Sequence, residues 1–143
     1  MTFVFPDETG FSQRPSVRRT WAPRGQTPLL REAFNWKRLS GIGALVCTPS
    51  GERVRLFLSF QEGNVASSDV QAFLRSLRCH LRGKVMLFWD GLPAHRSRYT
   101  EQFLFRQRHW LEVHRLPAYA PELNPMEYLW AHLDNTHLAN FCY

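Results

Sequence analysis

The chain has 143 residues, of which 44% are hydrophobic and 14% aromatic. Its 18 lysines and arginines outnumber its 12 aspartates and glutamates, which gives a net charge of +6. This composition excludes disordered and fibrous proteins, and the length is enough for one domain with its own core. The longest apolar run, 85–89, is too short to cross a bilayer, and the first residues lack a secretory signal. Since the three scattered cysteines fit reduced thiols, we expect a cytoplasmic protein without a membrane partner.

The positive charge is concentrated in the first four fifths of the chain. Residues 1–115 carry all 18 basic residues against 9 acidic ones, a net charge of +9, whereas residues 116–143 contain no lysine or arginine. Sixteen of the 18 basic residues are arginine, which binds phosphate through two donors at once. The bias indicates a polyanionic partner such as nucleic acid, although the codon preference of a GC-rich genome would produce it equally well.

The first elements along the chain are predicted to be strands. We expect a short strand at 3–5, ended by Pro6, and then a basic loop rich in glycine and proline over 9–26. Residues 38–47 and 53–59 predict a hairpin, because the second segment alternates between apolar and other side chains and is expected to be half-buried.

From residue 67 onward the apolar period changes to that of a helix. The expected elements are a helix capped at Ser67–Asp69 that runs to Leu81, a buried strand at 85–89, a helix at 99–108, a strand at 111–116 and a helix from 125 to about 140. An antiparallel meander followed by alternating helices and strands predicts an α/β fold with a mixed sheet flanked by helices. This is the element order of the ribonuclease H-like fold, and we expect residues 1–143 to form one such domain.

Two carboxylates are expected at the ends of strands in this sheet. Asp7 follows the first strand and Asp90 follows the buried one, so they meet at one edge if the two strands are parallel neighbours. Glu127 lies in the first turn of the last helix, where Asn124 suits the N-cap and Pro125 the first helical position. Three converging carboxylates suit Mg²⁺ or Mn²⁺, and two such ions support phosphoryl transfer.

Each of these carboxylates also has a purely structural interpretation. Glu8 is as good a candidate ligand as Asp7, and both fit a solvated loop. Asp90 followed by Gly91 is a good turn, and Glu127 stands where it would close a capping box with Asn124. The local sequence leaves these alternatives open.

Three blocks of the sequence resemble the motifs of mariner-type DDE transposases, also called DDE-superfamily endonucleases. The blocks are FPDETGF at 5–11, continuing through 19–28, LFWDGLPAH at 87–95 and LPAYAPELNPMEYLW at 116–130. The resemblance spans nearly the whole chain, and the third block is the most specific.

This resemblance implies a ribonuclease H-like catalytic core that cuts and rejoins DNA at transposon ends with divalent metal. Its catalytic and metal-binding carboxylates correspond to Asp7, Asp90 and Glu127, separated by 82 and 36 residues. We therefore expect the catalytic domain of a bacterial insertion-sequence transposase, associated with the nucleoid and using Mg²⁺ or Mn²⁺, with two ions bound.

The resemblance also sets expectations about partners. Family members carry an N-terminal DNA-binding region, whereas only six residues precede Asp7. We expect another transposase chain or an upstream-encoded segment to bind the transposon ends, and a homo-oligomer when the enzyme is active. One alternative is an inactive remnant that binds DNA or a partner subunit. A host nuclease or resolvase of the same fold is another.

The expected nucleic-acid contacts are basic residues near these carboxylates. They are Arg14, Arg18, Arg19 and Arg24 in the loop that contains Trp21, and His95, Arg96 and Arg98 after Asp90. A solvated basic loop explains the first group equally well. His95 is expected either to reach the scissile phosphate or to orient Asp90, and a structural histidine is the alternative.

Overall fold

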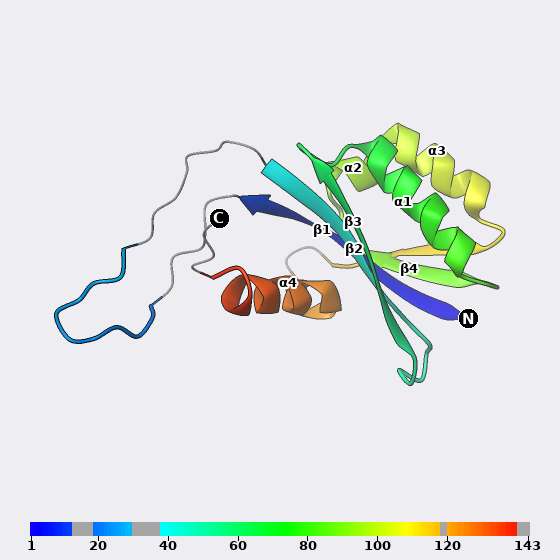
Figure 1. Cartoon of the computed structure of the whole chain (residues 1–143). Helices are drawn as coiled ribbons and strands as arrows, with labels where there is room; N and C mark the ends of the chain where they lie inside the picture. The colour runs from blue at the N-terminus through cyan, green and yellow to red at the C-terminus, as the bar shows by residue number, and fades with distance from the viewer. Residues whose placement is uncertain (13–18, 30–37, 118–119, 140–143) are drawn as a thin grey trace.

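The computed structural model describes residues 1–12, 19–29, 38–117 and 120–139. Its centre is a five-stranded sheet in the order β3-β2-β1-β4-β5 (Figure 1). The strands are β1 (Thr2–Ser12), β2 (Arg38–Cys47), β3 (Val54–Glu62), β4 (Val85–Trp89) and β5 (Leu111–Arg115). The first three strands are antiparallel, while β4 runs parallel to both β1 and β5. The predicted mixed sheet is confirmed, and β1 and β4 are the parallel neighbours that a meeting of Asp7 and Asp90 at one edge requires.

Helices cover both faces of this sheet. The helical elements are α1 (Ser67–His80), α2 (Pro93–Arg96), α3 (Arg98–Gln107), a 3₁₀ turn η1 (Pro121–Leu123) and α4 (Pro125–Thr136). The first three helices lie over one face and α4 lies over the other (Figure 1). Among the described residues, no helix is both long enough and apolar enough to cross a membrane.

The main core lies between the sheet and α1. Alternate residues of the central strands, Val4 on β1, Ala44 on β2 and Leu87 on β4, are fully buried there. The predicted helical stripe packs against them through Val70, Phe73, Leu74 and Leu77. In β4, Val85, Leu87 and Trp89 are buried on the α1 face, and Met86 and Phe88 on the other face are half-buried, so the continuous apolar run at 85–89 supplies apolar side chains to both faces.

Strand β1 is longer than the sequence predicts, because it continues past Pro6 to Ser12. It pairs with β4 only through Thr2–Val4, so that beyond Val4 one edge of β1 is open. A proline is tolerated at an open edge, where its missing N–H costs no ladder bond. Asp7 is therefore a residue of the strand, and the prediction that it follows the strand was wrong.

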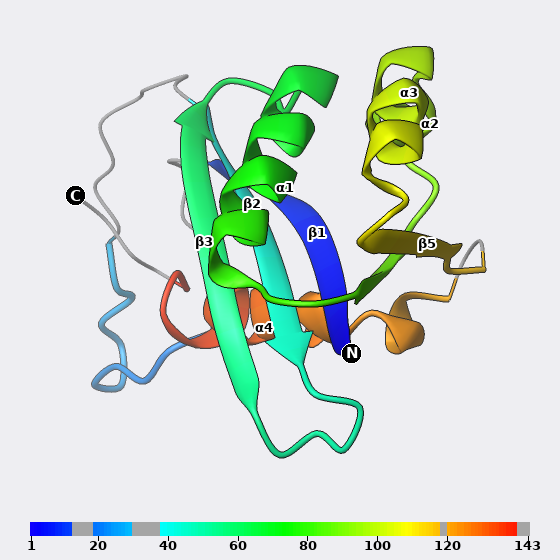
Figure 2. The same cartoon turned by 90° about the vertical axis from the view of Figure 1, so that its right-hand side faces the viewer.

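Strand β3 was expected to be half-buried, but its apolar face is exposed. Val54, Leu56, Leu58 and Phe60, which we call the β3 stripe, are 43–61% accessible. Figure 2 shows β3 at the edge of the sheet, with α4 lying across the strands beneath it. The stripe is on the α4 face, and α4 packs on β1 and β2. The alternation was correct: Phe57 on the other face packs against the core, but no described segment buries the stripe face of this outer strand.

Several helix boundaries differ from those predicted. The N-cap of α1 is Ala66, whose backbone N–H donates to the Asp69 carboxylate at 2.7 Å. The short helix α2 was not predicted, and α4 ends at Thr136, about one turn earlier than expected. These differences lie at element ends, where capping contacts decide the boundary.

Candidate active site

Asp7 lies in β1 at a point where the two central parallel strands have separated. The last pair between β1 and β4 is Val4 with Leu87, and Asp7 and Asp90 each stand three residues further along. The two carboxylates therefore occupy equivalent positions on neighbouring strands. Asp7 is directly opposite Gly43 of β2, so its side chain is on the α4 face of the sheet, and it is only 6% exposed.

Gly43 allows α4 to approach this position. A Cβ atom at Gly43 would overlap Met126 and would lie 2.7 Å from Cζ2 of Trp130, both on α4. Because no side chain stands there, the first turn of α4 lies directly on β2, beside the partner position of Asp7. This close packing brings Glu127 of the same turn near Asp7.

Asn124 and Pro125 begin α4 as predicted. The Asn124 side chain accepts a hydrogen bond from the Met126 N–H at 3.2 Å, and Pro125 occupies the first helical turn. The Asn124 N–H donates to the carbonyl of Pro121 at 2.9 Å. The Asn124 N–H is therefore already paired within η1, and it does not donate to the Glu127 carboxylate. The capping box that the sequence allows is not formed, and the Glu127 side chain is exposed.

Glu8 lies on the opposite face of β1 from Asp7. Its Oε1 atom is 2.8 Å from Nε2 of His95, which belongs to α2 on the other side of the sheet. Successive residues of a strand alternate between the two faces, so only one of the two acids can face Glu127. The structure selects Asp7 for the carboxylate group and assigns Glu8 to the contact with His95.

His95 is buried and joins two acids. The ring is 1% exposed and stacks on Trp89 with centroids 4.1 Å apart, while Nδ1 lies 2.7 Å from Oδ1 of Asp90. Both ring nitrogens are therefore engaged, Nε2 with Glu8 and Nδ1 with Asp90. The expected contact of His95 with nucleic acid is corrected, because no nitrogen is left for a phosphate, and the geometry favours the alternative that His95 orients Asp90.

The pKa values of these groups reflect burial and mutual charge. Burial, followed by the negative charge of Glu127 and then Glu8, raises the pKa of Asp7 from 3.8 to about 7, and Asp90 adds to the effect. Burial alone would lower the pKa of His95, but its hydrogen bonds to Asp90 and Glu8 and their charges outweigh it and raise the pKa to about 9. His95 is thus an imidazolium that donates from both nitrogens.

Asp90 responds in the opposite direction to Asp7. Burial acts to raise the pKa of Asp90, but hydrogen bonds from His95 and the Leu92 N–H, with the charges of His95 and Arg96, outweigh it and lower the pKa. Asp90 is therefore ionised at neutral pH, whereas Asp7 exchanges its proton there. Of the neighbouring charges, Glu127 raises the pKa of Asp7 most, followed by Glu8 and then Asp90.

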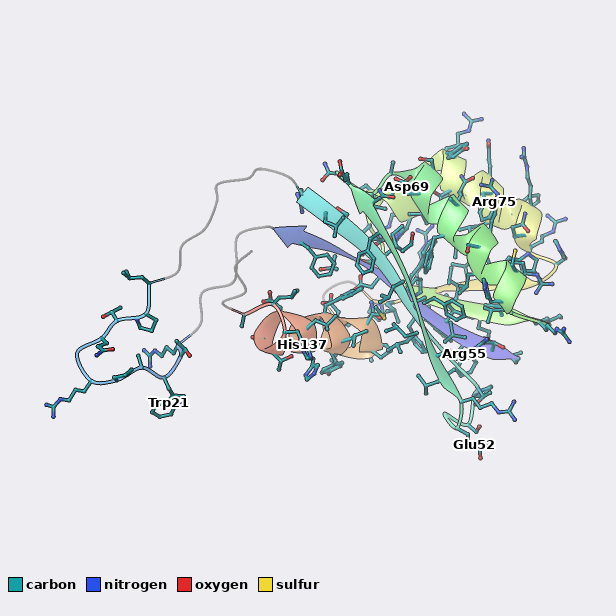
Figure 3. The ribbon with its side chains drawn as sticks, in the orientation of Figure 1. Trp21, Glu52, Arg55, Asp69, Arg75 and His137 are labelled. Carbon is teal, nitrogen blue, oxygen red and sulfur yellow. The ribbon has the colours of Figure 1, made fainter. Side chains whose placement is uncertain are left out.

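The basic residues expected near the site are placed unequally. The Arg96 guanidinium occupies the space a Cβ atom of Gly91 would need, next to Asp90. Arg98 is exposed on α3 and is not among the charges that act on Asp7 or Asp90. Arg19 and Arg24 are exposed on the segment 19–29, which stands away from the sheet with a fully exposed Trp21 at its side (Figure 3).

The remaining two arginines, Arg14 and Arg18, lie outside the described residues. The prediction that the arginine-rich loop stands beside Asp7 is not matched by its described part. Within the described residues, the hydrogen bond from the Gln26 N–H to the Pro23 carbonyl at 3.0 Å is internal to segment 19–29, and no described contact joins the segment to the sheet.

The donor set of the site consists of carboxylate oxygens, which suit hard divalent cations. No group of three acidic, histidine or cysteine side chains in the described part of the chain is arranged to hold an ion as it stands. Burial and then the charges of Glu127, Glu8 and Asp90 raise the pKa of Asp7, and a divalent cation bound there would offset this concentration of negative charge.

Two parts of this site were not predicted from the sequence. The Glu8–His95 contact joins residues 87 positions apart and has no local signal. The role of Gly43 was not predicted either, although a glycine within a strand does indicate close approach of another element. Its partner, α4, could not be identified without the fold.

Comparison with protein families gives one match across the chain. Residues 2–142 match the family model described as DDE superfamily endonuclease. A comparison with curated proteins finds no match.

Solved structures show the same fold at low sequence identity. A Mos1 transposase paired-end complex with left transposon end has a TM-score of 0.69 at 22% identity, covering 99% of this chain and 43% of that one. A Mos1 mariner paired-end complex with Mn gives 0.63 at 23%, covering 99% and 43%. The Mos1 transposase catalytic domain with raltegravir and Mg gives 0.61 at 20%, covering 99% and 63%. The chain thus spans less than half of the longer relatives, and the likeness supports the predicted ribonuclease H-like fold.

Proposed function

The chain belongs to the DDE superfamily endonucleases, and from this membership we propose that it is the catalytic domain of a transposase, which cleaves DNA at transposon ends and transfers the freed strand. The observation that carries the proposal is geometric: Asp7 and Asp90 stand at equivalent points past the last β1–β4 pair, and Glu127 lies in the first turn of the helix that packs on Gly43, opposite Asp7. These are the three carboxylates that the sequence motifs single out, and they come from β1, the end of β4 and the start of α4.

Asp7, Asp90 and Glu127 are the residues that would hold divalent metal. Bound there, Mg²⁺ or Mn²⁺ would activate the attacking oxygen and stabilise charge on the leaving oxygen. Their carboxylate chemistry supports this, as do the neighbouring structures that contain Mn or Mg. We propose two ions, the number that in-line phosphoryl transfer on DNA commonly uses.

The protein's own residues contribute position and charge. Asp7 must lose its proton to act as a ligand, and its raised pKa means that this happens near neutral pH. Asp90 is already ionised, and the exposed Arg96, whose charge acts on Asp90, would be a cation for a phosphate of the substrate. Since phosphoryl transfer depends mainly on positioning and electrostatics, these roles suffice for the protein.

We further propose that the substrate is transposon-end and target DNA, that the element is an insertion sequence, and that the active form is an oligomer. The relatives with transposon ends support the DNA partner, and the arginine-rich composition supports a polyanion. In a longer protein or a second chain, a separate DNA-binding region would select the ends. In a bacterial cell this activity would associate the chain with the nucleoid.

The test is nicking of supercoiled plasmid by the purified chain with Mg²⁺, Mn²⁺ or EDTA. We expect cutting that requires metal and is lost in Asp90→Asn, because that change removes one ligand charge without altering side-chain size. Glu122→Gln is the matched control, since it removes an exposed acid of η1 that is not among the charges acting on Asp7. Folded protein that cuts equally with EDTA, or equally as Asp90→Asn, would refute the proposal.

A further inference from the structure

The contact network around His95 determines how Asp90 is presented. Asp90 follows the last residue of β4, and His95 lies five residues later on α2, against the face of Trp89. The ring is held firmly because α2 is tied to its surroundings. The carbonyl of Ala94 accepts a hydrogen bond from the buried Thr100 hydroxyl at 2.7 Å, and Ser67 of α1 donates to the same carbonyl at 3.3 Å.

Only one oxygen of Asp90 is occupied in this arrangement. Oδ1 accepts hydrogen bonds from Nδ1 of His95 at 2.7 Å and from the Leu92 N–H at 3.1 Å. Both protein donors therefore reach the same oxygen, and within the described residues Oδ2 has no hydrogen-bond partner. The Asp90 side chain is 40% exposed, so it remains open to a cation or a phosphate.

The second nitrogen of His95 reaches across the gap between the two central strands. The β1–β4 ladder ends at Val4 and Leu87, and the Glu8–His95–Asp90 contacts join the two strands beyond that point. Glu8 is 12% exposed and is the neighbour of Asp7 in β1. Through Glu8, the ring is thus fixed to the strand that carries Asp7, so that it links the positions of Asp7 and Asp90.

We propose that His95 is a positioning residue, which is anchored by Glu8, fixes Oδ1 of Asp90 and leaves Oδ2 as the oxygen presented to the site shared with Asp7. This inference rests on the proposed function, since the orientation of Asp90 matters only if the three carboxylates act together. His95 acts through Asp90 and contacts no substrate. Glu8 in turn acts through His95.

The experiment measures Mn²⁺ binding by isothermal titration calorimetry, beside plasmid nicking and urea unfolding. In His95→Gln we expect Mn²⁺ affinity and nicking turnover to fall by about 10–100-fold, the usual effect of losing a residue that orients a ligand. The KM for DNA should stay within about twofold. His114→Gln is the matched control, because His114 also contacts a carboxylate, Glu112 at 2.9 Å, and stacks on a β4 ring, Phe88.

A double-mutant cycle separates positioning from a general loss of stability. Measured at pH 8, where Asp7 is already ionised and the effect of the Glu8 charge on its proton does not enter, Glu8→Ala should weaken Mn²⁺ binding in the parent but add no further loss in the His95→Gln background. Glu8→Gln keeps an oxygen acceptor for Nε2 and should lose less than Glu8→Ala. Losses that add, or Mn²⁺ affinity unchanged in folded His95→Gln, would overturn the positioning role.

These outcomes also separate the positioning role from the proposed function. If the parent binds Mn²⁺ and nicks plasmid while His95→Gln behaves identically, only the positioning role is refuted. If the folded parent neither binds Mn²⁺ nor nicks plasmid, the proposed function and the inference built on it are both refuted.

Discussion

The charge on Asp7 should destabilise the metal-free protein at neutral and alkaline pH. Its pKa is raised from 3.8 to about 7 by burial and by the charges of Glu127, Glu8 and Asp90. One pKa unit corresponds to about 1.4 kcal/mol, so the ionised carboxylate costs the folded state up to about 4 kcal/mol. Because the pKa of Asp7 is higher in the folded than in the unfolded protein, the contribution of Asp7 to the free energy of unfolding is fully present below about pH 4. This contribution is lost progressively as the pH rises to about 7.

Asp7→Asn should remove this dependence. The variant keeps an oxygen that can accept the hydrogen bond from the Glu8 backbone, but it never becomes charged. Urea unfolding in EDTA should give equal free energies for parent and variant near pH 4. As the pH rises from about 4 to about 7, the parent should lose about 1.4 kcal/mol per pH unit relative to the variant, and the difference between the two should stay constant above about pH 7.

Metal should narrow the difference between the two proteins. At pH 8, Mn²⁺ at about 100 times its Kd should stabilise the parent by about 2.7 kcal/mol and the variant much less, which offsets most of the roughly 4 kcal/mol by which the variant is more stable in EDTA. Glu122→Gln, which removes an exposed acid, should follow the parent throughout. A constant difference between parent and Asp7→Asn at every pH, or a less stable Asp7→Asn at pH 8 in EDTA, would refute the reasoning.

Three further changes test the packing and the basic segment. Gly43→Ala should lower the free energy of unfolding in urea by about 1–3 kcal/mol, because the added Cβ would overlap α4. Gly41→Ala is the control and should lose less, because its Cβ would meet ring atoms 3.1 Å away. Equal losses in the two variants would contradict this reasoning. Asn124→Ala should cost about 1 kcal/mol, because it removes the α4 cap, and an unchanged unfolding midpoint would argue against the cap. Replacing Arg19 and Arg24 by alanine should reduce the salt slope of DNA binding by about 2 if both contact phosphates, and an unchanged slope would remove them from the interface.

The sequence predicts the parts of the site that depend on local pattern. The run 85–89 predicts a buried central strand, and Asn124 with Pro125 predicts the start of α4, so that Asp90 and Glu127 are correctly placed at element ends. The parallel pairing of β1 with β4 follows from element order. These features are local or follow from general rules of sheet topology, which is why they are predictable.

The features that the sequence does not predict depend on the neighbours that the fold brings to each strand, both at its edges and on its two faces. Pro6 is a strand-ending signal in isolation, but β1 continues through it because its edge is open there. The choice between Asp7 and Glu8 depends on α4 lying on one face and α2 on the other. Alternation in β3 gives the two sets of side chains, but it does not tell which set is covered.

The exposed β3 stripe has a consequence for preparing the isolated chain. A nine-residue edge strand with four accessible apolar side chains on one face is a template for pairing with another strand. The net charge of +6 keeps molecules apart at low ionic strength, but at 1 M salt electrostatic repulsion is screened within about 3 Å. Concentrated salt is the usual means of removing nucleic acid from a basic protein. For this chain, the same wash would therefore promote self-association through the stripe, and purification has to balance the two effects.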